Sequence, residues 1–314
     1  MKMRLVYVFL TLLALAVGGS AGAQGPVVLD PAKLKLASLN ALVVDAEADR
    51  PLYAKAADEV TPIASVTKLM TAMVVLDAAQ ALDEPLAVDM DDFDFLKGSS
   101  SRLRMGATLT RTEMLRLALM ASENRAASAL ARYYPGGTEA AVAAMNAKAA
   151  ALGMTRSHFA DPTGLSPENV STAKDLAKMV SAAAQYPLIR DFSTTPSHYV
   201  EVQPAGRIVG FNNSNRLVVA NDWNIQVQKT GYIREAGRCL VMMVQIASKP
   251  FVIVLLDSVG KYTRLGDANR VKHWLETGQS LPVAKVAVPA AKTKKPVKGT
   301  LAPKLAQNAK SRGA

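Results

Sequence analysis

Pro62-Ile-Ala-Ser-Val-Thr-Lys-Leu-Met-Thr-Ala-Met73 begins a run, predicted to be helical over 64–82, that is apolar on most of its sides. A helix that is apolar nearly all round belongs in the interior of a protein. This helix nevertheless carries four polar residues near its start, and these are Ser65, Thr67, Lys68 and Thr71. The stretch therefore predicts a central buried helix, and its buried polar residues indicate a functional site at the start of that helix.

Strand patterns lie on both sides of this helix in the chain. Two short β-rich segments joined by a polar turn precede it, and three longer ones follow after a mostly helical region. The five expected strands are 41–45, 51–55, 224–232, 238–247 and 251–258. An amphipathic helix is expected at about 263–276. This order predicts an α/β (α+β) fold, with one five-stranded antiparallel sheet built from both chain ends, flanked by helices, and an all-helical lobe inserted at about 88–200.

The inserted lobe contains its own helix signals. Thr110-Arg-Thr-Glu113 matches a capping box and opens the apolar run 114–120. Further helices are expected at 124–134, 138–152 and 172–185. Gly153 stands where a helix C-cap favours glycine.

The N-terminal residues have the pattern of an export signal. Lys2 and Arg4 precede a short apolar run, and Ala21-Gly22-Ala23 matches a signal peptidase site. We expect a signal peptide over residues 1–23, a mature chain from Gln24 and a periplasmic location. A retained membrane anchor is the alternative, although the run is shorter than the roughly 20 apolar residues that span a bilayer. No later stretch is long and apolar enough to do so, so we expect no transmembrane anchor after cleavage.

The net charge of +11 comes from the two ends of the chain. The leader has two basic residues, and 283–314 has eight, with no acidic residue in either. Removing these from the 37 basic residues leaves 27 against 26 acidic ones over 24–282, which argues against nucleic-acid binding. The tail is rich in Ala, Lys and Pro, so we expect it to be disordered. It is expected either to contact an anionic wall or membrane surface or to serve only solubility.

Cysteine and histidine exclude several other chemistries. The single cysteine, Cys239, cannot form an intramolecular disulfide, and its strand-like surroundings predict a small buried hydrophobe. The three histidines, His158, His198 and His273, lack ligand spacing, and neither His-Glu-x-x-His nor Cys-x-x-Cys is present. No phosphate-binding glycine loop occurs either. We expect neither a metal nor an organic cofactor.

Ser65 and Lys68 are spaced so that a hydroxyl and an amine project from one face of a helix. Burial and a neighbouring cation both lower the pKa of a lysine, and a neutral amine can take a proton from serine. The motif alone is weak, because Ser-x-x-Lys also occurs at Ser171 and Ser258. Its weight comes from two further motifs.

A serine acyl-enzyme of the penicillin-recognising kind needs Ser-x-x-Lys, then Ser-x-Asn, then Lys-Thr-Gly, in that order along the chain. Ser-x-Asn occurs at Ser38 and Ser122, and Lys-Thr-Gly occurs once, at Lys229. Only one combination satisfies the order, and it consists of Ser65/Lys68, Ser122/Asn124 and Lys229/Thr230/Gly231. Each motif alone has an ordinary structural explanation, such as a helix cap or a surface lysine, but the ordered set indicates a catalytic site.

These motifs resemble the low-molecular-mass penicillin-binding proteins, the serine D-Ala-D-Ala peptidase family, from about residue 38 to 282. Longer segments resemble the penicillin-binding-protein-7 type, a periplasmic D-alanyl-D-alanine endopeptidase. These segments are 62–73, Leu119-Met-Ala-Ser-Glu-Asn-Arg-Ala126, Tyr134-Pro-Gly-Gly137, Asp161-Pro-Thr-Gly-Leu165 and Asp222-Trp-Asn-Ile-Gln226. Glu123 stands where many carboxypeptidase relatives have glycine, and the chain lacks their β-rich C-terminal domain and amphipathic anchor. Both departures favour the endopeptidase branch.

The resemblance implies a serine DD-peptidase/β-lactamase-like fold and a role for each motif residue. Ser65 would be the nucleophile, Lys68 the general base and Ser122 a proton relay to the leaving amine. The other implied roles concern substrate binding. Asn124 would hold Lys68 and the substrate amide, Lys229 would supply positive charge, and Thr230 would contact the substrate carboxylate. Gly231 would admit substrate to the strand edge, and the backbone N–H groups of Ser65 and Tyr232 would form an oxyanion hole. The implied partners are peptidoglycan peptides and, as covalent inhibitors, β-lactams.

Three alternatives stay open at this point. A D-Ala-D-Ala carboxypeptidase would use the same motifs and differ only in the leaving group. A class A β-lactamase would need Glu-x-x-Leu-Asn, which Glu168-Asn-Val-Ser-Thr172 does not match. A non-enzymatic wall-binding or antibiotic-sensing protein would have no need of the complete set of motifs.

Overall fold

The computed structural model describes residues 27–220 and 222–283. The predicted signal peptide, the start at Gln24 and nearly all of the predicted tail lie outside the described residues. These three assignments therefore stay predictions.

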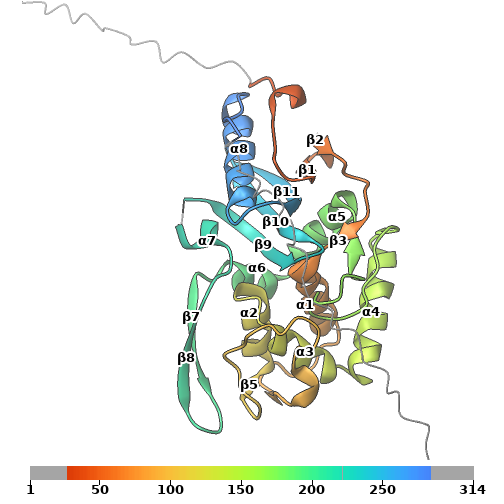
Figure 1. Ribbon diagram of the computed structural model, residues 1–314, viewed down its shortest axis with the longest axis vertical. Coiled ribbons are helices and arrows are strands. Elements are labelled where there is room, and N and C mark those ends of the chain that lie inside the picture. The colour runs from red at the N-terminus through yellow and green to blue at the C-terminus, as the bar shows by residue number, and fades with distance from the viewer. Residues whose placement is uncertain (1–26, 221, 284–314) are drawn as a thin grey trace, which may run out of the picture. The chain divides into compact units, whose positions relative to one another are not determined.

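A five-stranded antiparallel sheet forms the centre of the described residues (Figure 1). Its strand order is β2 (Arg50–Lys55), β1 (Asn40–Asp45), β11 (Lys249–Ser258), β10 (Gly237–Ile246) and β9 (Asn224–Ile233). The N-terminal hairpin thus joins the C-terminal strands through the β1–β11 ladder, in which Leu42 lies opposite Val254. The predicted five-stranded antiparallel sheet is confirmed, and β9, which carries the Lys-Thr-Gly motif, lies at one edge.

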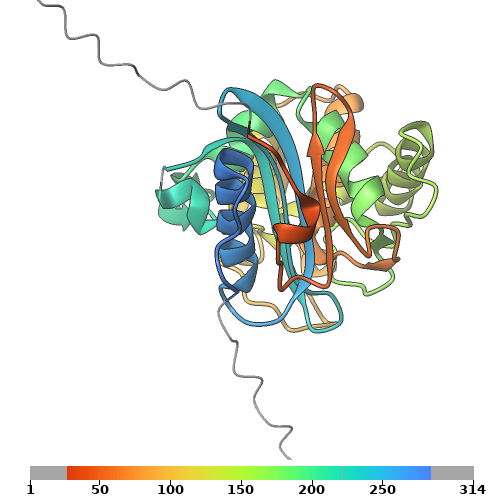
Figure 2. The same cartoon turned by 90° about the horizontal axis from the view of Figure 1, so that it is seen from above.

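Both faces of this sheet are covered, because its three inner strands have apolar residues on both sides. On one face α8 (Thr263–Thr277) packs through Val271 and Trp274. On the other face Leu42, Val254 and their neighbours join the large core that contains the helices of the insert. Figure 2 shows the sheet nearly edge-on, with α8 on one side and the helices of the insert on the other.

The central buried helix starts as a 3₁₀ turn rather than as an α-helix. The 3₁₀ segment η2 covers Ala64–Thr67, and α1 follows over Lys68–Asp77. The helix therefore ends five residues before the predicted boundary at 82, and Ala79 has a positive φ of 50° just beyond it. All of α1 as far as Val75 is buried, as its composition indicates.

The insert is mainly helical, and it also contains short β elements that the sequence analysis did not predict. Its helices are α2 (Arg111–Met120), α3 (Asn124–Arg132), α4 (Gly137–Ala151), α5 (Ala173–Ala183) and α6 (Pro187–Thr194), with a 3₁₀ turn η3 at Met90–Asp92. Two short ladders pair β3 (Thr61–Pro62) with β6 (Val170–Ser171) and β4 (Pro85–Ala87) with β5 (Thr108–Thr110). The remaining elements are a hairpin of β7 (Ser197–Val202) and β8 (Arg207–Asn212), the short helix α7 (Arg216–Ala220) and the N-terminal 3₁₀ turn η1 (Pro31–Lys33).

The predicted capping box at Thr110 forms only in part. The Thr110 side chain accepts a hydrogen bond from the Glu113 backbone N–H, as predicted. The Glu113 carboxylate instead lies 2.9 Å from Nε2 of His198 in β7. The second half of the box was therefore a wrong prediction, because a residue 85 positions away takes the carboxylate.

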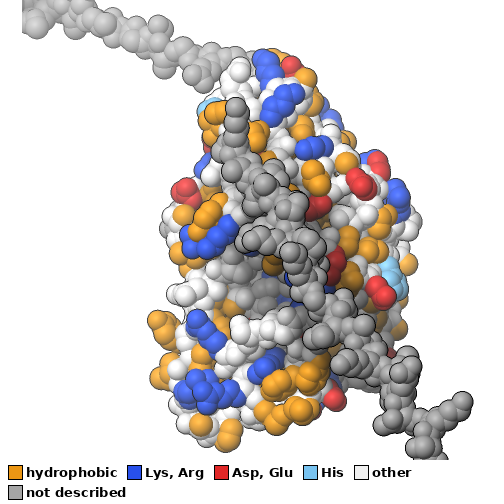
Figure 3. Space-filling view, in the orientation of Figure 1, with side chains coloured by type: hydrophobic (Ala, Val, Ile, Leu, Met, Phe, Trp, Pro, Cys, Tyr) orange, Lys and Arg blue, Asp and Glu red, His pale blue; other side chains and the backbone are white. Residues whose placement is uncertain are grey.

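Neither sign of charge dominates the face seen in Figure 3, where basic and acidic side chains are interspersed with hydrophobic ones. Among residues 27–220 and 222–283, no helix combines the length and the hydropathy needed to cross a bilayer.

Candidate active site

Ser65 lies in η2 and Lys68 is the first residue of α1, one helical turn further on. The side-chain amine of Lys68, which is only 1% exposed, donates to three oxygens. These are Ser65 Oγ at 2.9 Å, Asn124 Oδ1 at 2.7 Å and the Thr163 carbonyl at 2.5 Å. The structure thus brings the first two predicted motifs into direct contact.

Burial lowers the pKa of Lys68 to about 7, and the carboxylates of Asp161, Glu123 and Asp94 only partly oppose this shift. A substantial fraction of Lys68 is therefore neutral near neutral pH. A neutral amine at hydrogen-bond distance from Ser65 Oγ can take the hydroxyl proton as the oxygen attacks a carbonyl.

The second motif occupies the junction between α2 and α3. Ser122 lies in the connecting turn with a positive φ of 60°, and Asn124 is the first residue of α3. The left-handed conformation is unfavourable for a residue with a Cβ and is often found at functional sites. On its other side, Asn124 Nδ2 donates to Ser99 Oγ at 2.8 Å. Asn124 is thereby held between Lys68 and Ser99.

The third motif lies on β9, where Lys229 is completely buried. Its amine donates to Ser122 Oγ and to the Thr230 carbonyl, both at 2.8 Å. Burial lowers the pKa of Lys229 well below its ordinary value, and the charges of Lys68 and Arg264 add to this. Lys229 is therefore placed as a hydrogen-bond donor to Ser122, while its lowered pKa weakens the positive charge that the resemblance implies for it.

Gly231 packs against the segment that carries the nucleophile. A Cβ built at this position would lie 2.8 Å from the Ile63 carbonyl oxygen and 3.1 Å from the backbone nitrogen of Ser65. Only glycine allows η2 and β9 to approach this closely. The structure thus gives this glycine a role in packing, in addition to the predicted access for substrate. Tyr232 follows on the same edge strand with an exposed side chain.

The segment after Asp161 positions the Lys68 amine, a contact that the motifs did not predict. The Asp161 carboxylate accepts hydrogen bonds from the backbone N–H groups of Thr163, Gly164 and Ser166 at 2.6–2.8 Å. The turn so formed presents the Thr163 carbonyl to Lys68. A Cβ at Gly164 would lie 2.0 Å from the Ala64 carbonyl oxygen, so this glycine is required as well. The sequence Asp-Pro-Thr-Gly at 161–164 indicates a turn. A turn sequence alone does not reveal that the Thr163 carbonyl contacts Lys68.

Two further residues beside β9 were also missed. Ser214 Oγ lies 2.7 Å from Thr230 Oγ1 and fixes the orientation of that hydroxyl. Arg264, from the first turn of α8, donates to the Gly231 carbonyl at 3.2 Å and is only 9% exposed. Its Nε is buried without a hydrogen-bond partner among the described residues. A guanidinium at the wall of the site is suited to an anionic group of a substrate.

These residues surround one cleft of about 730 Å³. Ser65, Ser122, Asn124, Thr230, Gly231 and Tyr232 line it together with Ser214 and Arg264. At a further part of its wall lie residues of the loop before β5 and of the turn after β9, namely Leu96, Lys97, Ser99, Ile233, Arg234 and Glu235. The cleft is large enough for a peptide of several residues.

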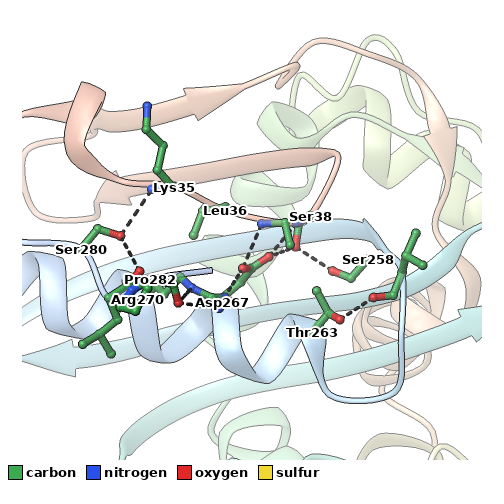
Figure 4. A network of polar contacts seen from close by, with 12 residues as sticks. Lys35, Leu36, Ser38, Ser258, Thr263, Asp267, Arg270, Ser280 and Pro282 are labelled. Carbon is green, nitrogen blue, oxygen red and sulfur yellow. Dashed lines mark hydrogen bonds and ion pairs between the residues drawn. The ribbon is translucent and has the colours of Figure 1, made fainter. Parts of the chain in front are cut away.

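The serines of the rejected motif copies lie elsewhere and have structural partners. Ser38 donates to the Asp267 carboxylate at 2.6 Å and lies 2.6 Å from Ser258 Oγ (Figure 4). Ser171 lies 2.7 Å from Ser157 Oγ beside Asp175. None of the three lines the cleft.

Cys239 is completely buried, as predicted, and burial raises the pKa of its thiol to about 11. It is therefore no candidate for a nucleophile. Within the described residues no three or more His, Cys, Asp or Glu side chains are grouped so that they could hold a metal ion.

A family model described as D-alanyl-D-alanine carboxypeptidase matches residues 28–260. The chain is 47% identical over 292 residues to a D-alanyl-D-alanine endopeptidase of Pseudomonas aeruginosa, with 93% of each chain covered. It is 48% identical over 260 residues to a D-alanyl-D-alanine endopeptidase of Escherichia coli K12, covering 83% of this chain and 84% of the relative.

Among solved structures, penicillin-binding protein D2 of Listeria monocytogenes in its ampicillin-bound form is similar, with a TM-score of 0.67. It is 28% identical, and the match covers 78% of this chain and 98% of that protein.

Proposed function

The chain belongs to the serine DD-peptidase family described as D-alanyl-D-alanine carboxypeptidase, and within it we propose an endopeptidase that cuts D-alanyl cross-links of peptidoglycan. The observation that carries the proposal is the buried Lys68 amine 2.9 Å from Ser65 Oγ, in a cleft open to a peptide.

The acylation step follows from these contacts. Ser65 Oγ attacks the carbonyl carbon of the D-alanine whose bond is cut, and its proton passes to the neutral Lys68 amine. Backbone N–H groups of Ser65 and Tyr232 stabilise the oxyanion, an effect typically worth about 3 kcal/mol per donor. Asn124 holds Lys68 through its Oδ1 and offers its amide to the substrate.

The leaving group departs as an amine, so it must receive a proton. Ser122, which accepts a hydrogen bond from Lys229, relays the proton held by Lys68 to the nitrogen as the C–N bond breaks, and Lys68 becomes neutral again. Water then attacks the acyl-enzyme and gives a proton to Lys68, which passes it to Ser65 Oγ as the ester bond breaks.

The substrate's carboxylate belongs beside Thr230 and Arg264. The Thr230 hydroxyl is oriented by Ser214, and Arg264 supplies a positive charge at the wall of the same cleft. The sequence led us to expect positive charge from Lys229 alone. This assignment gives Arg264 a part in binding the carboxylate as well. An extended peptide can add as a further strand along the free edge of β9.

The endopeptidase branch is supported by the two relatives of that name and by Glu123 in the second motif. A carboxypeptidase that releases terminal D-alanine is the second candidate, favoured by the description of the family model. Both reactions use the same acyl-enzyme and differ in whether the leaving amine belongs to D-alanine or to a diamino acid.

We further propose that the enzyme is exported to the periplasm, since residues 1–23 have the pattern of a signal peptide. The catalytic domain is then 24–282, and the basic tail 283–314 contacts an anionic wall or membrane surface. β-Lactams are expected to acylate Ser65 because they present a strained amide to the same cleft.

Two measurements test the proposal. Labelled benzylpenicillin should acylate the wild-type protein and leave Ser65→Ala unlabelled. Digestion of purified muropeptides should convert cross-linked dimers to monomers. Release of free D-alanine from pentapeptides with intact dimers would favour the carboxypeptidase, and a wild-type protein that is never labelled would refute the Ser65 mechanism.

A further inference from the structure

An ion pair lies at the wall of the cleft, and the catalytic steps above do not use it. Lys97 Nζ lies 2.7 Å from Glu235 Oε1, and both residues line the cleft. Lys97 belongs to the loop between η3 and β5, and Glu235 to the turn between β9 and β10. The pair therefore connects the helical insert to the strand that carries the third motif.

The loop that presents Lys97 is held by its own hydrogen bonds. The Asp94 carboxylate accepts from the backbone N–H groups of Leu96, Lys97 and Ser99 at 2.8–3.0 Å. Ser99 Oγ in turn accepts from Asn124 Nδ2. Lys97 is thus placed at a fixed position relative to the catalytic residues.

The direction in which the substrate runs along β9 places its acyl-donor part beside Lys97 and Glu235. This placement rests on the proposed function. If the carboxylate on the leaving side lies at Thr230, the peptide runs antiparallel to β9 and its donor part extends toward Ile233 and Glu235. Glu235 is four residues beyond Gly231, a distance of about 13 Å along an extended strand. A residue next to the scissile D-alanine, with a long side chain, falls within this reach.

The chemistry of the donor fits the groups found there. The two peptides of a cross-link are copies of one sequence, so the donor carries its own diamino acid directly before D-alanine. The free end of that side chain bears an ammonium group and, in a diaminopimelate type, a carboxylate. Leu96, which is 72% exposed and lines the cleft, offers an apolar surface for the methylene groups between backbone and side-chain end.

We propose that Lys97 and Glu235 form a specificity subsite for the free zwitterionic end of the donor diamino acid. Glu235 binds the ammonium group and Lys97 binds the carboxylate, so the ion pair between them is exchanged for two ion pairs with the substrate. Exposed ion pairs contribute little to stability, so this one can open without loss of the fold.

A matched ion pair elsewhere provides the control. Lys148 in α4 and Asp77 in α1 are also 2.7 Å apart, and their side chains are 21% and 43% exposed, against 30% and 39% for Lys97 and Glu235. Neither Lys148 nor Asp77 lines the cleft. A purely structural role would make the two pairs equivalent.

The test uses three synthetic cross-linked peptides that differ only at the donor side-chain end: free, N-acetylated and carboxyl-amidated. With the wild-type enzyme we expect kcat/KM to fall about 5-fold for each modified peptide. Glu235→Gln should abolish the discrimination against the acetylated peptide. Lys97→Met should abolish the discrimination against the amidated peptide. Lys148→Met and Asp77→Asn should keep both.

Equal turnover of all three peptides by the wild-type enzyme would overturn the subsite, as would variants that slow all three peptides alike. Labelling of the wild-type enzyme by benzylpenicillin separates this failure from that of the proposed function. A protein that is labelled and cleaves all three peptides equally loses only the subsite. A protein that is not labelled and cleaves none of them loses the proposed function itself.

Discussion

Two buried polar clusters of this protein differ in how their charges are balanced. The active-site cluster consists of Ser65, Lys68, Ser122, Asn124 and Lys229. The Asp267 cluster, between α8 and the chain before β1, consists of Ser38, Ser258, Asp267 and Arg270 (Figure 4). The charged side chains of both clusters, Lys68, Lys229, Asp267 and Arg270, are buried, whereas Ser65, Ser122 and Asn124 are partly exposed to the cleft.

In the Asp267 cluster the charges cancel. Arg270 donates to Asp267 at 2.7 Å, and the same carboxylate accepts from the backbone N–H groups of Ala37 and Ser38. In the active-site cluster two lysine amines are buried, and neither forms an ion pair with a carboxylate of the described residues. Their hydrogen-bond partners are neutral oxygens, and burial lowers the pKa of both amines, although nearby carboxylates partly oppose the shift of Lys68. An uncompensated buried amine is costly for stability and useful as a base, which separates a catalytic cluster from a structural one.

The largest expected effect is on chemistry. Lys68→Met should reduce the rate of acylation by benzylpenicillin at least about 10³-fold, because Ser65 loses the base that takes its proton. The variant should still fold, since methionine fills the buried site without a charge. Stopped-flow acylation and urea unfolding measure the two effects. Acylation within 10-fold of wild type would show that Lys68 is not the base.

The next effect is on stability and concerns the other cluster. Asp267→Ala should lower the free energy of unfolding by about 3 kcal/mol, because it leaves the Arg270 charge buried without its partner. The control is Asp58→Ala, which removes an exposed ion pair with Lys174 and should cost less than about 1 kcal/mol. Equal urea midpoints for the two variants would contradict the contrast drawn between buried and exposed pairs.

The sequence allowed the sheet, the buried helix and the three motifs to be predicted, because each depends on local periodicity or on order along the chain. It could not separate Ser65 from Ser171 and Ser258 by environment, and only motif order rejected the latter two. The partners that come from distant segments were missed. The Thr163 carbonyl, Ser214 and Arg264 reach the site through turns and packing that no local pattern encodes. The β7–β8 hairpin was missed although Val200, Val202, Val209 and Phe211 alternate with exposed residues.

The pH dependence of acylation sharpens the comparison of the clusters. The pKa of Lys68 is lowered from 10.5 to about 7, so the neutral amine predominates only above that pH. The acylation rate should therefore fall about 10-fold per pH unit on the acid side of about pH 7. The rate constant for benzylpenicillin, measured from pH 5 to 9, checks this. An acid limb near pH 10, typical of an exposed lysine, would contradict a buried base without an ion-pair partner.

The smallest expected effect concerns Glu123, which stands between the two residues of the second motif. Its carboxylate is one of three acidic groups that raise the pKa of Lys68 against the effect of burial. Glu123→Gln removes that negative charge, so the pKa of Lys68 should fall and the acid limb of the acylation profile should move to lower pH by up to about one unit. Glu113→Gln is the matched control, because Glu113 pairs with His198 and is not among the groups that shift Lys68. Burial raises the pKa of Glu123 itself, so the shift depends on Glu123 being ionised in the pH range of the limb. A limb that stays in place in Glu123→Gln would mean that Glu123 does not act on the base through its charge.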